Sequence, residues 1–423
     1  MNAFFAKISQ AFRDKSLRKR ILFVVLALVA FRLLAAIPIP GIDVVRLASL
    51  IENSQFLGLL NIFSGGGLSN LSIVMLGVGP YITASIIMQL LTIMIPRMKA
   101  MYQEEGEAGR AKFAQYSRRL SFPLALLQAF SFIVIFQRQG IIPDLDAFGL
   151  IMNVLVISAG STLLMWIGEL ITEFGLGNGT SLIIFAGIVA SLPQAVSGAL
   201  AAYDPSQLPV YIGLIALALA VIYAVVFITE AERPIPVTYA KQVRGMKVYG
   251  GVSTYLPLRL NQAGVIPIIF ALSILLFPQM IFNFFAASSN QVLQSVSSVG
   301  LSFLNNHLLY NSAYFLLVFI FTYFYTAVTF DPHMISENLQ KSGAFIPGVR
   351  PGQSTAEYLS KIVTRITLVG ALFLGVIAVL PLILRTATGL TTLAIGGTSL
   401  LIAVSVVLDV VKKLDAQLSM REY

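Results

Sequence analysis

Residues 63–81 decide how the chain folds, and they read FSGGGLSNLSIVMLGVGPY. The stretch ends in an apolar run typical of a membrane helix, but it begins with three glycines among serines and an asparagine. Glycine weakens a helix by about 1 kcal/mol relative to alanine, and hydrocarbon offers no partner to unpaired backbone groups. We therefore expect a helix from about Val74, preceded by a re-entrant segment over 64–72 inside protein or beside water. An ordinary loop outside the membrane is the alternative.

The composition identifies a polytopic membrane protein. Of 423 residues, 57% are hydrophobic and only 11% are charged, with a mean hydropathy of +0.85. Soluble proteins carry about 25% charged residues. The absence of cysteine excludes disulfides, thiolate metal sites and thiol catalysis. The two histidines, His307 and His333, stand alone and are interpreted as surface residues.

The N-terminus does not resemble a cleavable signal sequence, because its apolar run is not followed by a small-residue cleavage pattern. Residues 1–20 are basic and amphipathic, with apolar side chains at roughly helical spacing. We expect a short helix on the membrane surface or on a partner. The apolar residues that carry this prediction are Phe4, Phe5, Ile8, Phe12 and Leu17.

Ten segments are long and apolar enough to cross a bilayer, which takes about 20 residues of helix. They are approximately 21–37, 75–95, 119–137, 150–171, 181–200, 210–229, 263–283, 313–330, 364–384 and 396–411. With a cytoplasmic N-terminus, 24 of the 28 Lys and Arg residues fall on the cytoplasmic side. This bias places both termini in the cytoplasm. Topology alone explains the net charge of +9, although anionic lipid, an acidic partner or RNA would also match it.

Ten spans divide into two sets of five with opposite orientation, which permits an inverted repeat. We place the N-terminal half at 21–200, the C-terminal half at 201–411 and a cytoplasmic tail at 412–423. The expected fold class is all-α, with ten transmembrane helices in two pseudo-symmetric halves. No residue-level match between the halves supports the repeat.

Two cytoplasmic segments, about 230–262 and 332–363, are too long for simple connections. In the first, Val, Thr and Tyr around Gly250–Gly251 indicate a hairpin whose basic tip is Lys241, Arg244 and Lys247. The second has a turn-rich tip around Arg350, after which Ser354 and Thr355 are predicted to start a helix with Glu357 in its first turn. Both segments are typical of a docking surface.

No ionisable residue lies at the centre of any predicted span. Glu169, Asp331 and Asp409 lie near span ends, and Arg32 either snorkels or faces a partner. Ion-coupled transporters usually need a buried carboxylate or relay, so this class is disfavoured. Uncharged polar side chains are expected to face other helices or water, and they are Thr83, Ser85, Gln89, Gln128 and Ser273.

Six stretches then give the sequence a close resemblance to the bacterial SecY family, the channel subunits of the protein-secretion translocon. The stretches are RLLAAIPIPGID, NIFSGGGLSNLSIVMLGVGPYITASIIMQLL, ITEFGLGNGTSLIIFAGIVA, NQAGVIPIIFALSILLFP, KSGAFIPGVRPGQSTAEYL and GGTSLLIAVSVVLD. They occur in the family's order over about residues 20–411. The outer loops, such as 284–312, match weakly.

The resemblance implies a clamshell-like channel in the inner membrane, with a central pore and a plug at about 61–73. By this likeness the plug includes Asn61, Phe63, Ser64, Gly65, Gly66, Gly67, Leu68, Ser69, Leu71 and Ser72. The implied pore ring is Val78, Ile82, Ile184, Ile188, Ile269 and Ile402. An apolar ring excludes ions by dewetting. Val78 is smaller than the isoleucine expected there. Taken alone, the same side chains fit simple packing.

The resemblance also implies a lateral gate between spans two and three on one side and spans seven and eight on the other. The five polar residues named above would form its seam, which a signal sequence opens toward lipid. The long loops would bind the SecA motor and the ribosome through Arg350, Lys241, Arg244, Lys247 and Arg259. SecE and SecG subunits are further implied partners.

No cofactor and no catalytic residue are expected, and no GxxxxGK[ST] motif is present. A partner or the proton gradient must therefore supply energy for translocating nascent polypeptides. Two alternatives remain from the residues alone. One is a secondary transporter for a small solute, suggested by the broken second span and the inverted halves, and the other is a membrane scaffold or insertase without a pore.

Overall fold

The structure is a computed structural model of the chain, and it describes most residues from 14 to 419. The described residues are 14–39, 61, 64, 66–68, 70–138, 140, 142–143, 145–201, 208–240, 242–244, 247–249, 253–286, 290–388 and 396–419. The amphipathic helix predicted over 1–20 falls outside this set as far as residue 13. Residues 15–20 are the first turns of the helix that contains the first predicted span.

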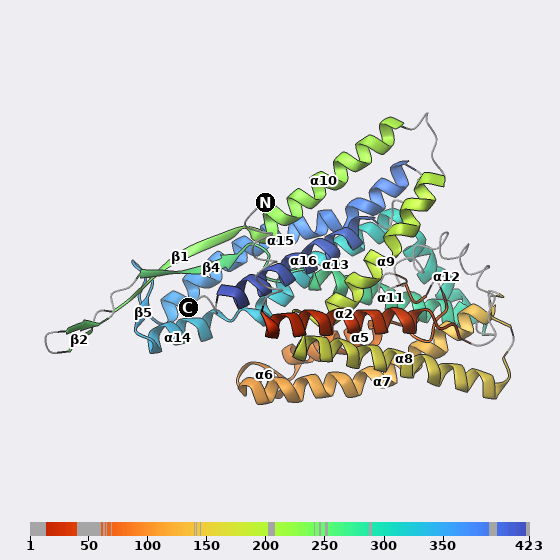
Figure 1. Cartoon of the computed structure of the whole chain (residues 1–423), viewed down its shortest axis with the longest axis horizontal. Helices are drawn as coiled ribbons and strands as arrows, with labels where there is room; N and C mark the ends of the chain where they lie inside the picture. Colours follow the sequence, from red (N-terminus) through yellow and green to blue (C-terminus); the bar gives the residue numbers. More distant parts are fainter. Residues whose placement is uncertain are drawn as a thin grey trace. The chain divides into compact units, whose positions relative to one another are not determined.

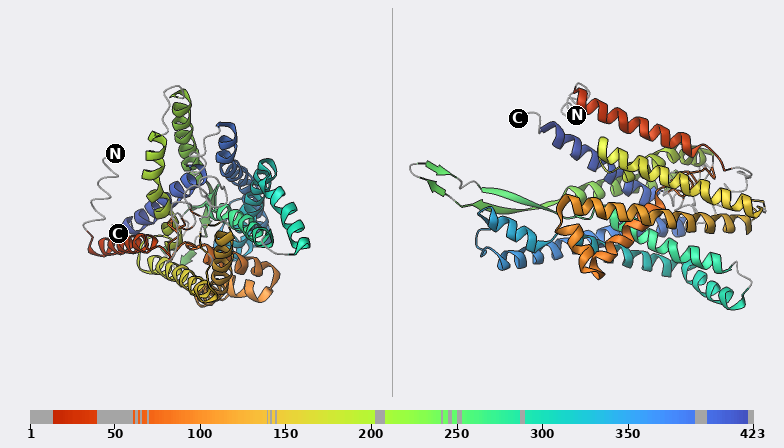
Figure 2. Two further views of the ribbon diagram at one scale, coloured as in Figure 1. Left: turned by 90° about the vertical axis from the view of Figure 1, so that its right-hand side faces the viewer. Right: turned by 90° about the horizontal axis from the view of Figure 1, so that it is seen from below.

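The described residues of the first part of the chain form six helices (Figure 1). They are α2 (Lys15–Ala35), α5 (Gly79–Met94), α6 (Pro96–Gln103), α7 (Gly106–Arg138), α8 (Ala147–Phe174) and α9 (Gly179–Ala201). Asp14 caps α2, because its carboxylate accepts hydrogen bonds from the backbone N–H groups of Ser16 and Leu17 at 2.7 and 3.3 Å. α7 packs against both α5 and α8, and Figure 2 shows α7 and α8 side by side.

The second part holds further helices and all the described strands. The helices are α10 (Leu208–Glu230), α11 (Ile266–Ala286), α12 (Gln291–Asn305), α13 (His307–Thr329), α14 (Pro332–Lys341), α15 (Gln353–Thr388) and α16 (Gly396–Ser419). The strands are β1 (Glu232–Tyr239), β2 (Gln242–Arg244), β3 (Lys247–Tyr249), β4 (Ser253–Arg259) and β5 (Ala344–Phe345).

Each of the ten predicted spans coincides with one helix, so the all-α membrane architecture is confirmed. Within the described residues, five helices are long and apolar enough to cross a membrane. A sixth candidate is the α5–α6 pair, which bends by 112°. The described parts of α9 and α11 are apolar but shorter. The number ten therefore stays a prediction.

Several helices extend well beyond the apolar segments that predicted them. α7 begins at Gly106 rather than near 119, and α15 begins at Gln353 rather than near 364. Hydropathy marks the part of a helix that crosses lipid, whereas the backbone ladder continues wherever propensity and packing allow. For the same reason the polar helices α6 and α14 were missing from the prediction.

Two compact units divide the chain. One comprises Met1–Pro209, Ser273–Tyr310 and Pro381–Tyr423, and the other comprises Val210–Leu272 and Asn311–Leu380. The predicted boundary between halves at residue 200 stays a prediction.

A three-stranded antiparallel sheet in the second unit runs in the order β4–β1–β5. The register sets Ile235 opposite Leu256 and Pro236 opposite Tyr255, and Thr238 pairs with Phe345 on the other side. β2 and β3 extend this hairpin, and Arg244 opposite Lys247 is their last pair. The predicted hairpin with a basic tip at Arg244 and Lys247 is therefore confirmed, whereas Gly250 and Gly251 lie outside the described residues.

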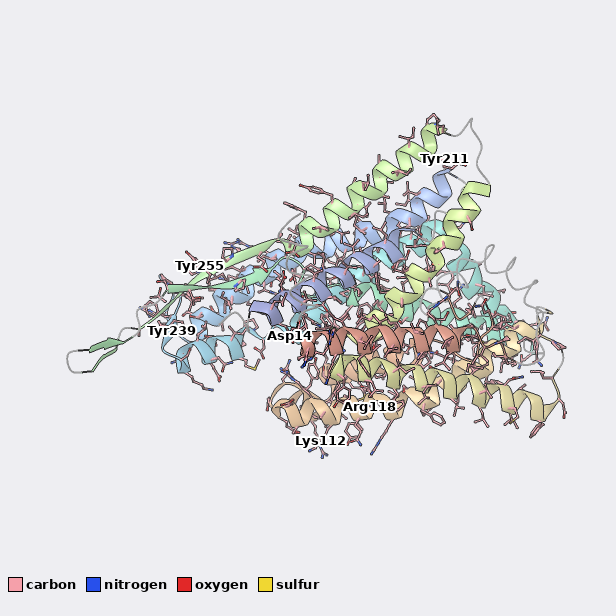
Figure 3. All side chains as sticks on the ribbon, viewed as in Figure 1. Asp14, Lys112, Arg118, Tyr211, Tyr239 and Tyr255 are labelled. Atoms are coloured by element: carbon pink, nitrogen blue, oxygen red, sulfur yellow. The ribbon has the colours of Figure 1, made fainter. Side chains whose placement is uncertain are left out.

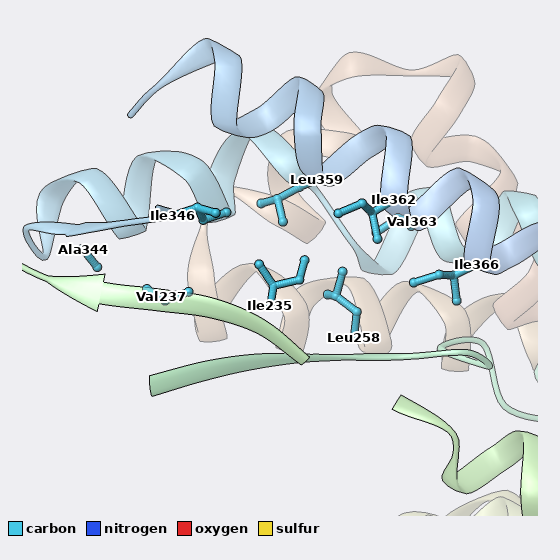
Figure 4. Packing of buried hydrophobic residues seen from close by; sticks show 9 residues of the cluster. All are labelled: Ile235, Val237, Leu258, Ala344, Ile346, Leu359, Ile362, Val363 and Ile366. Atoms are coloured by element: carbon cyan, nitrogen blue, oxygen red, sulfur yellow. The ribbon is translucent and has the colours of Figure 1, made fainter. Parts of the chain in front are cut away.

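One face of this sheet is covered by α15 and by the strand-and-turn segment before it (Figure 4). The buried cluster consists of Ile235, Val237, Leu258, Ala344, Ile346, Leu359, Ile362, Val363 and Ile366. The opposite face carries Tyr255, which is 67% exposed (Figure 3). Alternation of buried and exposed residues along β1 is expected for a sheet covered on one face. The core fixes the hairpin to the start of α15.

Candidate functional site

The segment before α5 is a series of tight turns rather than a helix. The Ser64 hydroxyl donates to the carbonyl of Asn61 at 3.0 Å and accepts the backbone N–H of Leu68 at 3.0 Å. The Ser72 hydroxyl donates to the carbonyl of Gly67, also at 3.0 Å. Ser64 and Ser72 are 1% and 0% exposed. The polar side chains thus satisfy the backbone of their own segment within the protein, as the re-entrant interpretation requires.

Glycine is required at two positions of this segment. Gly66 has φ +83°, in the left-handed region that favours glycine. A Cβ on Gly67 would lie 3.0 Å from both the Ser72 hydroxyl and the Val74 carbonyl oxygen. Three members of the predicted plug, Phe63, Gly65 and Ser69, lie outside the described residues.

Three hydrogen bonds between described residues join the segment to the end of α2 and the residues after it. The Ile39 N–H donates to the Leu71 carbonyl at 2.9 Å, and the Ile73 N–H donates to the Ile37 carbonyl at 3.0 Å. The Asn70 side chain adds a weaker bond to the Ala35 carbonyl at 3.4 Å. The end of α2 and the residues directly after it therefore hold the segment on one side.

On its C-terminal side the segment is held by α8. The Ser161 hydroxyl donates to the carbonyl of Gly77 at 2.9 Å, and Gly160 lies directly against the carbonyl of Ile73. The prediction that the next helix begins near Val74 is wrong, since α5 begins at Gly79. Gly77 has φ +57°, which a continuous helix does not allow, and Pro80 then sits in the first turn.

All six residues of the predicted pore ring are buried, between 0% and 7% exposed. Val78 is the N-cap of α5 and Ile82 lies one turn later. Ile184 and Ile188 share one face of α9, and α9 packs against α16, which carries Ile402. Ile269 belongs to the second unit, on α11. The closure of these side chains into one ring stays a prediction.

The predicted gate residues on α5 bond along their own helix. The Thr83 hydroxyl donates to the Gly79 carbonyl at 3.0 Å, and the Gln89 amide donates to the Ser85 hydroxyl at 3.4 Å. The Gln89 Oε1 atom is buried and has no hydrogen-bond partner among the described residues. Gln128 lies half-buried on α7, which packs against α5, and Ser273 lies half-buried on α11. The seam between these helices stays a prediction.

An ion pair between α7 and α8 was not expected from the sequence. The guanidinium of Arg118 lies 2.8 Å from the carboxylate of Glu169, whose side chain is 24% exposed (Figure 3 shows Arg118 on α7). Both residues lie near matching ends of neighbouring predicted spans, which is the only signal in the sequence. The pair ties the two helices together at that end.

The predicted docking residues fall on the sheet and on the turn before α15. Arg259 pairs with Glu232 across β1 and β4, with 3.4 Å between the charged atoms. Arg244 and Lys247 flank the end of the β2–β3 hairpin, whereas Lys241 lies outside the described residues. Arg350 is exposed, and its backbone carbonyl accepts the Thr355 hydroxyl at 2.8 Å.

The helix predicted at Ser354 begins one residue earlier, at Gln353. Glu357 consequently lies beyond the first turn, contrary to the prediction. The backbone of Gly352 has φ +94°, and its carbonyl accepts the Ser336 hydroxyl of α14 at 2.6 Å. Contacts with α14, which hydropathy did not indicate, set where α15 begins.

Comparison with known proteins agrees with this architecture. The model of the SecY family matches residues 72–411. The chain is 44% identical to the protein translocase subunit SecY of Mycobacterium tuberculosis (strain ATCC 25618 / H37Rv), over 97% of both chains. It is also 44% identical to the protein translocase subunit SecY of Thermotoga maritima, over 98% of this chain and 95% of the relative.

Solved structures share the fold at 18% sequence identity. The one described as "The structure of a protein conducting channel" aligns with a TM-score of 0.65, over 94% of this chain and 92% of the other. A SecY structure concerned with a plug domain that maintains a membrane seal gives 0.62, over 95% and 93%. Sec61 in a canine ribosome-channel complex gives 0.58, over 94% and 92%.

The match to the family model covers most of the chain, and two relatives of 44% identity cover nearly all of it. The helices coincide with the predicted spans. The chain therefore belongs to the SecY family of multi-pass membrane proteins, and its function is that of a protein translocase subunit.

Proposed function

We propose that this chain passes unfolded polypeptides through a pore sealed by the six buried apolar side chains of the predicted ring. The observation that carries the proposal is the turn-rich segment before α5, whose Ser64 and Ser72 are buried and which leads directly to Val78 and Ile82. Regular helix would be more stable at that depth. A segment of glycine and serine turns is less stable than a helix, as expected for a plug that has to move out of the pore.

The plug would be released by breaking a small set of contacts. Toward the end of α2 the described segment makes two backbone hydrogen bonds and one side-chain hydrogen bond, and toward α8 it accepts the hydroxyl of Ser161. Elements that move in function belong to the less stable parts of a fold. A SecY relative of similar fold is described as having a plug domain that stabilises the closed state.

The gate would open sideways between two pairs of helices. One pair is the second and third spans, α5 and α7, and the other is the seventh and eighth spans, α11 and α13. Polar pairs in membrane proteins contribute about 0.6 kcal/mol on average, so an apolar signal sequence can replace them at small cost. The buried Gln89 Oε1 atom marks a position that gains a hydrogen bond if the seam rearranges. Membrane lipid would then receive the released helix.

The hairpin and the turn before α15 would face the cytoplasm, as would both termini. Exposed cations there, including Arg350, suit acidic protein surfaces or RNA. We assign this surface to the SecA motor and to the ribosome. A relative of the same fold occurs in a ribosome-channel complex. SecE and SecG would complete the complex, and the chain itself would perform no catalysis.

The proposal is tested by photocrosslinking a secretory precursor that a folded tail has stalled midway. Photoreactive residues replace Ile82 and Ile269, which are both 7% exposed. Leu219 is the control, because it is 62% exposed on α10. Adducts at Ile82 and Ile269 but not at Leu219 are expected if polypeptide passes the ring.

Absence of adducts at both ring positions, with the precursor verified as stalled and partners intact, would contradict the pore. Single-channel conductance after deletion of residues 61–72 separates the alternatives. An unplugged channel leaks ions without substrate, whereas a scaffold does not. A small-solute transporter would show substrate-driven flux in liposomes that lack every partner.

A further inference from the structure

Helix α12 lies between α11 and α13, in the weakly matching region 284–312, and no role has been assigned to it so far. Its 15 residues reach about 22 Å, which is shorter than the ~30 Å hydrocarbon core. It therefore does not cross the membrane. Its sequence, QVLQSVSSVGLSFLN, contains no Asp, Glu, Lys or Arg.

One side of α12 packs on its own unit. Ser297 is fully buried, and its hydroxyl donates to the carbonyl of Phe282 on α11 at 2.6 Å. A Cβ on Gly300 would approach the Phe282 ring to 2.6 Å, so only glycine allows this contact. Three half-buried leucines lie on the same side, namely Leu293, Leu301 and Leu304.

A second side of α12 is apolar and exposed. Val292 and Val299 are 69% and 71% exposed, and Val296 and Phe303 are 49% and 48% exposed. Their spacing of four, three and four residues puts all four on one stripe of a helix. The remaining side is polar and exposed, with Gln291, Gln294, Ser295, Ser298 and Ser302. α12 thus has three sides, and the described residues cover one of them.

We propose that α12 lies in the membrane interface, with the stripe Val292–Val296–Val299–Phe303 in lipid and the glutamine-serine side in water. The protein-facing side then rests on α11. Interfacial helices place their apolar face about 5–10 Å into the boundary between headgroups and acyl chains. This arrangement gives each of the three sides a solvent that suits it.

Continuity with lipid-facing surface favours the bilayer over a protein partner. α12 is separated from α13 by Asn306 alone, and Leu308 at the start of α13 is 74% exposed. On α11, Phe277 and Ile281 are 44% and 36% exposed in the same unit. Exposed apolar side chains therefore occur on both flanking helices as well as on the stripe. Because α12 carries no charge, apolar burial and not anionic lipid drives its binding.

Single-tryptophan fluorescence tests the proposal in the full chain, with its co-purifying subunits, reconstituted into phosphatidylcholine vesicles. Trp166 is the one tryptophan of the chain, and Trp166→Phe removes it so that a new tryptophan can be introduced. Val299→Trp then reports on the stripe and the adjacent Ser298→Trp reports on the polar side. Val296→Trp repeats the test one turn away.

Lipids brominated near the headgroup end of the acyl chain should quench Val299→Trp and Val296→Trp strongly and Ser298→Trp weakly. Aqueous acrylamide should give the opposite order. Quenching should stay unchanged when anionic phosphatidylglycerol is added. Equal lipid quenching on both sides would overturn the proposal. Shielding of the stripe from lipid and acrylamide alike would overturn it in favour of a protein partner.

Discussion

The turn segment 64–78 and helix α10 show opposite relations between polarity and burial. The segment contains glycine, serine and asparagine, yet Ser64 and Ser72 are fully buried. α10 is almost wholly apolar, yet only 6% of its most apolar stretch is buried within the chain. Leu219 and Tyr223 on α10 are 62% and 72% exposed. In a soluble protein we would expect the reverse, with the polar segment exposed and the apolar helix buried.

The difference follows from the solvent. Lipid tails are as apolar as leucine, so no hydrophobic force draws leucine away from them. Small residues let backbones approach closely, and polar groups are satisfied inside the protein. α15 supports this view, because it is nearly as apolar as α10 but 61% of its apolar stretch is buried. Its Gly370 and Gly375 lie directly against Leu260 and the Phe315 ring.

The largest expected effect comes from adding one methyl group to Gly160. A Cβ there collides with the carbonyl of Ile73, so Gly160→Ala forces α8 away from the turn segment. We expect a loss of about 1–3 kcal/mol, typical of overpacking. Gly213→Ala on α10 meets no atom within 4 Å and should stabilise by up to about 1 kcal/mol, since alanine favours helix.

Thermal unfolding of both purified variants in one detergent measures this contrast. Opposite shifts of the midpoint are expected. Equal shifts in the same direction would show that the contact between α8 and the turn segment does not limit stability.

A smaller effect is expected from Ser161→Ala, which removes the hydrogen bond from α8 to the Gly77 carbonyl. The expected cost is about 0.5–1.5 kcal/mol. Ser158→Ala is a matched control, because Ser158 is equally buried on the same helix but donates to the Val154 carbonyl of that helix. In denaturant titration, Ser161→Ala should have a lower free energy of unfolding than Ser158→Ala. The reverse order would show that the hydrogen bond from Ser161 to Gly77 does not stabilise the turn segment against α8.

The ion pair Arg118–Glu169 tests whether a polar contact at the exposed end of the spans stabilises the fold less than the buried hydrogen bond of Ser161 does. The two side chains are 46% and 24% exposed, so water and salt screen them. A double-mutant cycle with Arg118→Gln and Glu169→Gln should give a coupling of about 0.2–1 kcal/mol. The coupling should fall as salt is added. A coupling free energy that does not change with salt concentration would contradict the interpretation that the ion pair is solvated.

Much of this arrangement could be predicted from the sequence, but not its details. Composition and period gave the ten helical segments, and the glycines and serines indicated the turn segment. α5 starts at Gly79 because Gly77 has a positive φ and Pro80 lies in the first turn. The motif GVGP indicates this start, but the prediction followed the apolar residues that precede it. The basic tip of the hairpin was predicted, but the register that pairs Ile235 with Leu256 was not, because register is a long-range property.

Other features had no local signal at all. The hydrogen bond of Ser161 joins residues 84 positions apart, and no periodicity identifies such partners. Hydropathy likewise could not separate α10 from α15, because it measures preference for lipid over water and not for lipid over protein. Small residues distinguish the two helices only once their neighbours are known.

The smallest effect is expected on α10 itself, from Leu219→Ala. Truncating a buried leucine costs about 2–5 kcal/mol, whereas an exposed position changes stability by less than about 0.5 kcal/mol. Leu219 faces away from the chain, so its removed atoms contact lipid or detergent in both states. Unfolding in detergent of the isolated chain should therefore be unchanged. If the same substitution destabilises only the assembled complex, a partner subunit covers this side of α10, and its apolar surface serves assembly instead of lipid.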